Sequence, residues 1–185
     1  MPIYNFADIQ PKIDPTAFIH PDAVIIGDVT VGPQCSIWPG VVIRGDVNKI
    51  IIGSQTNIQD GSILHVKRPT KDYPQGAPLI IGDQVLIGHQ VTLHACTIEN
   101  RAMVGIGAIV LDDAIVAEQA MLGAGSMLTP GKVMEANSLW LGAPARFIRP
   151  RTDDEIVATA QTIISYCTLG EKYKEGLLTP QSIGI

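Results

Sequence analysis

The sequence predicts a parallel β-helix followed by one C-terminal α-helix. Three observations predict this fold: an aliphatic residue that recurs every six positions, a composition suited to narrow core layers, and a helix-capping motif near the end of the chain. Of the 185 residues, 46% are apolar, only 5% are aromatic and 18 are Gly. A core made from such residues must use small and β-branched side chains, which is typical of a solenoid.

The six-residue repeat is the strongest signal in the chain. It is interrupted by a three-residue insertion after Ile43 and by a loop at 66–78, and it drops one residue before Ile98. Neither an α-helix nor a plain alternating strand has a period of six, whereas a short strand with a tight corner does. All of the repeating positions are Ile, Val or Leu: Ile13, Ile19, Ile25, Val31, Ile37, Ile43, Ile52, Ile58, Leu64, Ile81, Ile87, Leu93, Ile98, Val104, Val110, Val116, Leu122 and Leu128.

This repeat resembles that of the hexapeptide-repeat proteins, which wind as left-handed parallel β-helices with three hexapeptides per triangular coil. The left hand comes from the resemblance, because the general rule for crossovers between parallel strands favours the right hand. The resemblance implies about six coils, stacked at roughly the 4.8 Å spacing of paired strands. It also implies a homotrimer, because proteins of this kind usually associate around the solenoid axis.

The β-helix domain is expected to span 1–150, with a protruding loop at 66–78. Residues 152–155 have the pattern of a capping box, and apolar residues follow them at helical spacing. A helix that packs on the β-helix is therefore predicted over 151–175, and 176–185 is expected to be a tail.

Charge and composition narrow the functional classes. A formal net charge of −5 and an isoelectric point near 5.2 argue against a nucleic-acid-binding or anionic-membrane surface. Residues 1–8 lack the basic and apolar regions of a secretory signal, and no stretch approaches a membrane span. Cys35, Cys96 and Cys167 form no CxxC motif, so a reduced, cytoplasmic protein is expected.

Three histidines fall at related positions of the repeat. With three hexapeptides per coil, Arg44, His65 and His94 each follow the inward aliphatic residue of the same face, so they form one outward-pointing column. His89 lies toward a corner of a different face, and Asp60 occupies the same place in the adjacent coil. In a threefold trimer one subunit's face meets its neighbour's, so the geometry predicts a site with two histidines from one chain and one from the next.

Three neutral imidazoles with an open fourth position are the ligands of a catalytic zinc site. The sequence therefore predicts a zinc ion bound by His65, His89 and His94 between subunits. Imidazole also suits iron and cobalt, so the ligands alone do not choose the metal. His20 lies far from the other histidines along the stack and is interpreted as an ordinary surface residue.

The same residues resemble the γ-class carbonic anhydrases and their bacterial YrdA-like relatives, over nearly the whole chain. The resemblance implies that the three histidines are zinc ligands. It also implies that metal-bound hydroxide hydrates carbon dioxide reversibly to bicarbonate. The matching motifs, in order, are Arg44-Gly45-Asp46, Thr56-Asn57-Ile58-Gln59-Asp60-Gly61-Ser62, Leu64-His65, Ile87-Gly88-His89 and Leu93-His94.

The resemblance further implies roles for the residues around the metal. Gln59 would orient the zinc-bound water, with Asn57 nearby, and Tyr166 on the C-terminal helix resembles the family's tyrosine near the site. Arg44 and Asp60 would pair across the subunit interface, with Asp46 supporting them.

The chain departs from the most active archaeal-type pattern in two places. Val47 stands where those enzymes have a glutamate, and the basic, Pro-rich loop 66–78 contains Asp72 as its only carboxylate. The acidic residues that carry protons away are therefore missing, and hydration activity is expected to be weak.

Other functions remain open at this point. The turn at 141–146 is shared with hexapeptide acyltransferases, which bind acyl-CoA between subunits and use a single catalytic His. Related zinc-bearing members are described as thioesterase-like, which suggests CoA-thioester hydrolysis. The last alternative is a non-catalytic, metal-binding or scaffold trimer.

Overall fold

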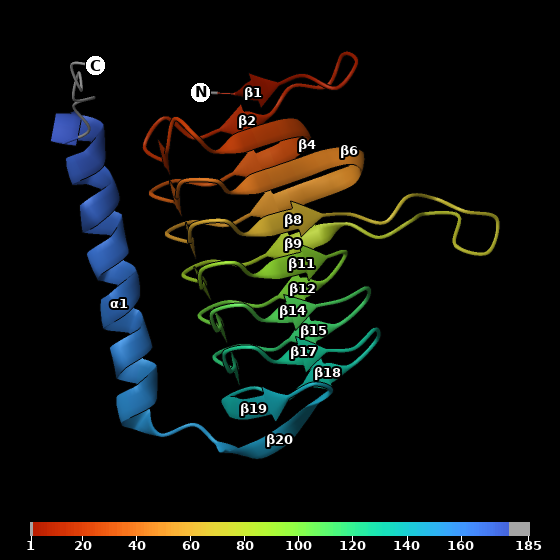
Figure 1. The fold of residues 1–185 in the computed structure, drawn as a ribbon, viewed down its shortest axis with the longest axis vertical. Coiled ribbons are helices and arrows are strands. Elements are labelled where there is room, and N and C mark those ends of the chain that lie inside the picture. Colours follow the sequence, from red (N-terminus) through yellow and green to blue (C-terminus); the bar gives the residue numbers. More distant parts are fainter. Residues whose placement is uncertain (1, 178–185) are drawn as a thin grey trace, which may run out of the picture.

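The six-residue repeat folds into short strands, each stacked on the equivalent strand of the next coil (Figure 1). This computed structural model describes residues 2–177. Every pair of strands is parallel except the last one, so the chain forms a parallel β-solenoid with three faces. The predicted fold class, stacked coils followed by one C-terminal helix, is confirmed.

We call the face that carries His65 and His94 the histidine face. Its strands are β8 (Ile63–His65), β11 (Thr92–His94), β14 (Ile109–Val110) and β17 (Met127–Leu128). We call the next face the third face, with β9 (Leu79–Ile81), β12 (Thr97–Ile98), β15 (Ile115–Val116) and β18 (Val133–Met134). Two long strands, β4 (Val24–Val31) and β6 (Val42–Ile52), run along both of these faces. Two short strands, β1 (Ile3–Tyr4) and β2 (Lys12–Ile13), pair with β4.

The remaining face lies against the C-terminal helix, and we call it the helix face. Its strands are β3 (Phe18–Ile19), β5 (Ser36–Ile37), β7 (Asn57–Ile58), β10 (Leu86–Ile87), β13 (Met103–Val104), β16 (Met121–Leu122) and β19 (Ser138–Gly142), with β20 (Ala145–Pro150) antiparallel to β19.

The aliphatic column of the repeat forms the core. All of its predicted positions are buried except Ile13, which is half-buried. Full burial of one Ile, Val or Leu side chain stabilises the fold by roughly 1.5–3 kcal/mol. The column runs further than the aliphatic series predicts, because Met134 and the aromatic Trp140 occupy the next two inward positions.

The interruptions in the repeat leave the register intact. β6 absorbs the three-residue insertion where it bends, and it still pairs Ile52 with Ile81 of β9. The loop at 66–78 leaves the solenoid between β8 and β9 and protrudes from it (Figure 1). His65 and His94 can therefore stand on adjacent coils even though the loop separates them in the sequence.

Helix α1 (Asp153–Lys172) runs along the helix face. Its predicted capping box is present: the Thr152 side chain accepts from the Glu155 backbone, and the Glu155 carboxylate accepts from the Thr152 backbone. At its other end Gly170 is buried against Phe18. A Cβ at position 170 would lie only 3.1 Å from the Cβ of Phe18, so the close packing favours glycine.

A π-helical turn, η1 (Tyr173–Leu177), ends the described chain, and most of the predicted tail, 178–185, lies outside the described residues. None of the helices within residues 2–177 is long and apolar enough to cross a membrane.

Candidate metal centre

His65 and His94 stand side by side on the histidine face. They pair in register at the ends of β8 and β11, and their ring centroids are 5.3 Å apart with the ring planes inclined by 52°. The register of β6 with β8 places Arg44 next in the same column. The column predicted from the six-residue period is therefore confirmed.

Asp46 supports the first imidazole of this column. Its carboxylate lies 3.0 Å from His65 Nε2 and also accepts from the Arg44 guanidinium. Burial would raise the pKa of Asp46, but the hydrogen bonds with Arg44 and His65 outweigh burial and lower it. Gly45 makes the motif possible, since a Cβ there would lie 2.5 Å from the Asp28 carbonyl oxygen.

Asp112 supports the second imidazole, and sequence reasoning missed it. Its Oδ1 contacts His94 Nδ1, which leaves His94 Nε2 free. Burial opposes ionisation of Asp112, but contacts with His94 and Lys67 outweigh it and lower the pKa of the carboxyl. A signal existed: Asp112 follows Val110 by two residues, and Val110 lies one coil beyond Leu93.

His89 lies on the other side of the histidine face, at the corner with the helix face. Its Nδ1 is 2.9 Å from Asp60 Oδ2, and both side chains are partly exposed, at 42% and 48%. The backbone links the same two coils, because Gln90 N donates to the Asp60 carbonyl at 2.9 Å. The prediction that Asp60 and His89 occupy equivalent places in adjacent coils is confirmed.

Two amide side chains are buried on the helix face beside this corner. Asn57 donates through Nδ2 to Ser36 Oγ at 2.8 Å, while its Oδ1 is buried without a hydrogen-bond partner. Gln59 follows in the same strand and is only 6% exposed. An unpartnered buried oxygen carries a desolvation cost, so Asn57 Oδ1 is an unused acceptor within the described chain.

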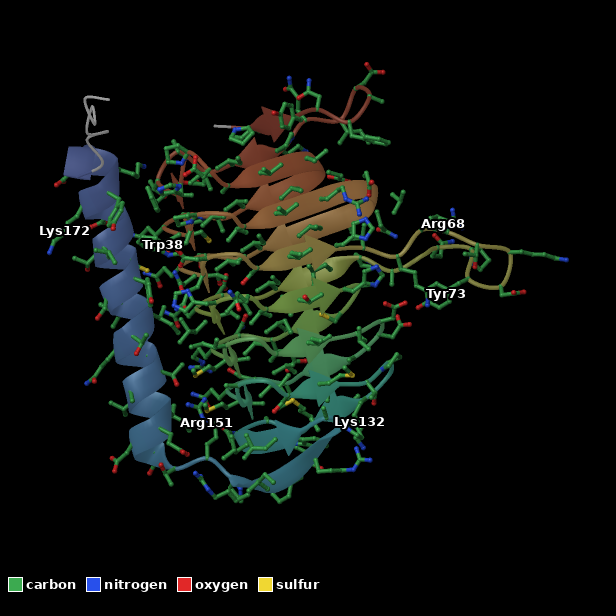
Figure 2. All side chains as sticks on the ribbon, in the orientation of Figure 1. Trp38, Arg68, Tyr73, Lys132, Arg151 and Lys172 are labelled. Carbon is green, nitrogen blue, oxygen red and sulfur yellow. The ribbon has the colours of Figure 1, made fainter. Side chains whose placement is uncertain are left out.

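Tyr166 of α1 covers this face together with Trp38. The two rings pack edge to face with centroids 5.6 Å apart, and Figure 2 shows Trp38 on the side of the solenoid that faces α1. Burial, and secondarily the charge of Asp60, raises the pKa of Tyr166. The Tyr166 hydroxyl therefore stays protonated near neutral pH and acts as a hydrogen-bonding group rather than a base.

The chain thus carries two clusters, one on the histidine face and one at its corner with the helix face. We call Arg44, Asp46, His65, His94 and Asp112 the paired-histidine cluster. We call Asn57, Gln59, Asp60, His89 and Tyr166 the amide cluster. Within one chain, residues 2–177 contain no group of three His, Cys, Asp or Glu side chains placed to hold a metal ion.

Comparisons with known proteins agree with this arrangement. Residues 10–45 match the family described as "Bacterial transferase hexapeptide (six repeats)". The chain is 48% identical to the protein YrdA of Escherichia coli over 168 residues, which cover 91% of each chain. It is 43% identical to a carbonic anhydrase of Geobacillus kaustophilus over 172 residues, which cover 93% of this chain and 91% of that one. The chain belongs to the γ-class carbonic anhydrase-like family of hexapeptide-repeat proteins.

A solved structure extends the agreement to three dimensions. The hexapeptide transferase family protein from Anaplasma phagocytophilum superposes with a TM-score of 0.86 at 43% identity, covering 93% of this chain and 98% of that one. Eight residues of the motifs that carry the family resemblance fall within the two clusters: Arg44, Asp46, Asn57, Gln59, Asp60, His65, His89 and His94.

One histidine was misinterpreted. His20 is not an ordinary surface residue, because it is only 9% exposed and lies on the helix face beside the ring of Phe18. Its Nδ1 accepts from the Asp22 backbone at 3.1 Å. The Nδ1 atom of the ring is thus satisfied by a local contact, which indicates a structural role.

Proposed function

We propose that the protein is a metal-dependent γ-class carbonic anhydrase that hydrates carbon dioxide reversibly to bicarbonate. The proposal includes a homotrimer in which His65 and His94 of one subunit and His89 of the next bind one Zn²⁺. The observation that carries it is the register of His65 and His94 on adjacent coils, together with a third histidine at the opposite edge of the same face.

The donor set fits a zinc ion. Each of the three imidazoles holds one ring nitrogen against a carboxylate, from Asp46, Asp60 or Asp112, and keeps the other nitrogen free. Metal-bound histidines usually have such a carboxylate partner, which fixes the ring and raises its basicity. Three neutral imidazoles leave one coordination position open, as catalytic zinc requires.

Bound Zn²⁺ supplies the Lewis acidity that makes hydroxide available near pH 7, where free water, with a pKa of 15.7, supplies almost none. The protein orients the reactants. The Gln59 carboxamide and the free Oδ1 of Asn57 are buried hydrogen-bonding groups next to the His89 corner. The Gln59 amide N–H is suited to donating to an oxygen of the nucleophile or product, and Asn57 Oδ1 to accepting from an O–H. The protonated Tyr166 hydroxyl adds a donor from α1.

The trimer is supported by two oppositely charged residues that stay partly exposed within one chain. Arg44 and Asp60 are 44% and 48% exposed in their side chains and lie in different clusters. Bringing the paired-histidine cluster of one copy against the amide cluster of the next would place these opposite charges together. Asp46, which already holds Arg44 within the chain, would then orient the guanidinium across the interface.

Elemental analysis of anaerobically purified protein, followed by a stopped-flow carbon dioxide hydration assay, tests this function. We expect one zinc, iron or cobalt ion per subunit and hydration activity that is lost with the metal. A CoA thioester, offered to the same preparation, should not be hydrolysed. A metal-loaded protein with no hydration activity at any buffer concentration would contradict the proposal, and thioester hydrolysis would then replace it.

A further inference from the structure

The protruding loop is attached to the solenoid beside the paired-histidine cluster. Its stem is closed by reciprocal backbone hydrogen bonds of 3.0 Å between Lys67 and Ala77. Asn48 Nδ2 donates to the Gln75 carbonyl at 3.0 Å and fixes the stem to β6. Figure 2 shows Tyr73 on the protruding part of the loop.

Two side chains of this loop contact the corner that follows β14. Lys67 Nζ lies 3.3 Å from Asp112 Oδ2 and 3.7 Å from Asp113 Oδ2, while Tyr73 Oη donates to Asp113 Oδ1 at 2.8 Å. Lys67 Nζ also lies 4.3 Å from the centroid of the Tyr73 ring. The ammonium therefore has three partners, Asp112, Asp113 and the Tyr73 ring, and the Lys67 side chain is 30% exposed.

Asp112 is the residue that joins the loop to the candidate metal ligand. One carboxylate oxygen, Oδ1, contacts His94 Nδ1, and the other, Oδ2, faces Lys67. A carboxylate held at both oxygens cannot rotate freely about χ2. Lys67 thereby fixes the direction in which Asp112 presents Oδ1 to the imidazole.

We propose that Asp112 is a positioning residue for His94 and that docking of the loop through Lys67 holds Asp112 in place. The metal part of this inference rests on the proposed function. An ionised carboxylate at Nδ1 keeps the neutral imidazole in its Nδ1–H tautomer, which reserves Nε2 as the ligand atom. Loop position and metal affinity are then coupled through one side chain.

The tautomer of His94 tests the first half in metal-free, full-length protein. Nitrogen-15 NMR of the imidazole near pH 8 should show the Nδ1–H form in the wild type. Asp112→Ala removes the acceptor, so the Nε2–H form should become the major one. Asp112→Asn keeps an oxygen acceptor and should restore the Nδ1–H form, which a purely structural role would not do. An unchanged tautomer in Asp112→Ala would overturn the proposal.

A matched pair of loop variants tests the second half. Lys67→Met removes the charge that holds Asp112, whereas Tyr73→Phe removes only the hydrogen bond to Asp113. Both should speed tryptic cleavage after Lys71, which reports loosening of the loop. Only Lys67→Met should weaken Zn²⁺ binding, by about 10-fold, the low end of the effect of losing an outer partner of a metal ligand.

Failure of the coupling through Lys67 and failure of the proposed function give different results. Equal Zn²⁺ affinity in Lys67→Met and the wild type, despite faster cleavage, would mean that Lys67 only anchors the loop and would overturn the coupling. A wild type that binds no Zn²⁺ would refute the proposed function, while the tautomer series would still decide whether Asp112 positions His94.

Discussion

The paired-histidine cluster and the amide cluster differ in chemistry and in exposure. In the first, charged groups surround two imidazoles, and its histidine side chains are 21% and 34% exposed. In the second, neutral amides dominate, and Asn57 and Gln59 are 1% and 6% exposed. The imidazoles of both clusters are thus partly exposed, whereas the two amides of the second cluster are buried beside α1.

This difference indicates a division of labour. Hydrogen bonds with Asp46 and Asp112 fix the imidazole rings, and fixed rings favour metal binding. Buried amides fix a nucleophile and stabilise developing charge, and these contacts favour turnover. A defect in any of the three imidazoles, or in a carboxylate that holds one, should therefore reduce metal content, whereas a defect in the buried amides should reduce rate.

The largest expected effect is loss of the metal. His65→Ala and His89→Ala should each leave the protein without Zn²⁺, although the two residues lie in different clusters, because two imidazoles are too few for a catalytic zinc site. Elemental analysis of the purified variants measures this. His20→Gln is the matched control and should keep full metal. If His89→Ala keeps its full metal content, the amide cluster is not part of the metal site.

The next largest effect separates the rate of hydration from the affinity for Zn²⁺. Gln59→Ala should lower kcat by about 100-fold with normal metal content, since one lost orienting hydrogen bond costs that much. Asp46→Asn should instead raise the Zn²⁺ dissociation constant by about 10-fold. Chelator competition and stopped-flow hydration on both variants give the comparison. The opposite pattern would contradict the division of labour.

Features that depend only on the six-residue period could be predicted from the sequence. Once three repeats make a coil, the register of His65 with His94 and of Asp60 with His89 is fixed, because every strand pairs with its equivalent. The capping box at Thr152 could also be predicted, since it depends on neighbouring residues alone. These predictions needed no knowledge of distant contacts.

The missed features depend on side chains that reach across a corner. Asp112 contacts His94 across a corner whose backbone takes positive φ values at Ala95 and Asp113, of 47° and 60°, and a repeat count does not give this geometry. The core extends to Trp140 because an aromatic ring replaces the aliphatic residue that the count required. His20 is buried by Phe18, one residue outside the aliphatic series.

A moderate effect concerns the proton released in hydration. Neither Gln59 nor Asn57 can accept a proton near pH 7, and Val47 supplies no carboxylate. Added imidazole buffer should therefore raise kcat more than kcat/KM. Val47→Glu should reduce this buffer dependence, since position 47 is exposed on β6 close to Asp46 and Arg44. Val47→Gln is the matched control, and an identical buffer response in both variants would argue against a missing proton carrier.

The smallest effect concerns the helix that carries Tyr166. Hydrogen bonds from Arg149 and the Thr152 backbone lower the pKa of Glu155 from 4.5 to about 2. A depressed pKa stabilises the fold above the unfolded value, and this stability is lost as pH falls from about 4.5 to 2. Glu155→Gln should therefore be less stable than the wild type at pH 7, with the gap narrowing at pH 3. Denaturant unfolding at both pH values measures it, and a constant gap would remove Glu155 ionisation as the cause.

Subunit exchange between His65→Ala and His89→Ala tests most directly whether the two clusters complete one site. Each variant alone should be free of Zn²⁺. If the two are unfolded together, refolded and supplied with Zn²⁺, mixed trimers should contain interfaces with all three histidines intact. Metal and hydration activity should then return to part of the wild-type level. Mixed trimers that form but recover no metal would contradict a site shared between subunits.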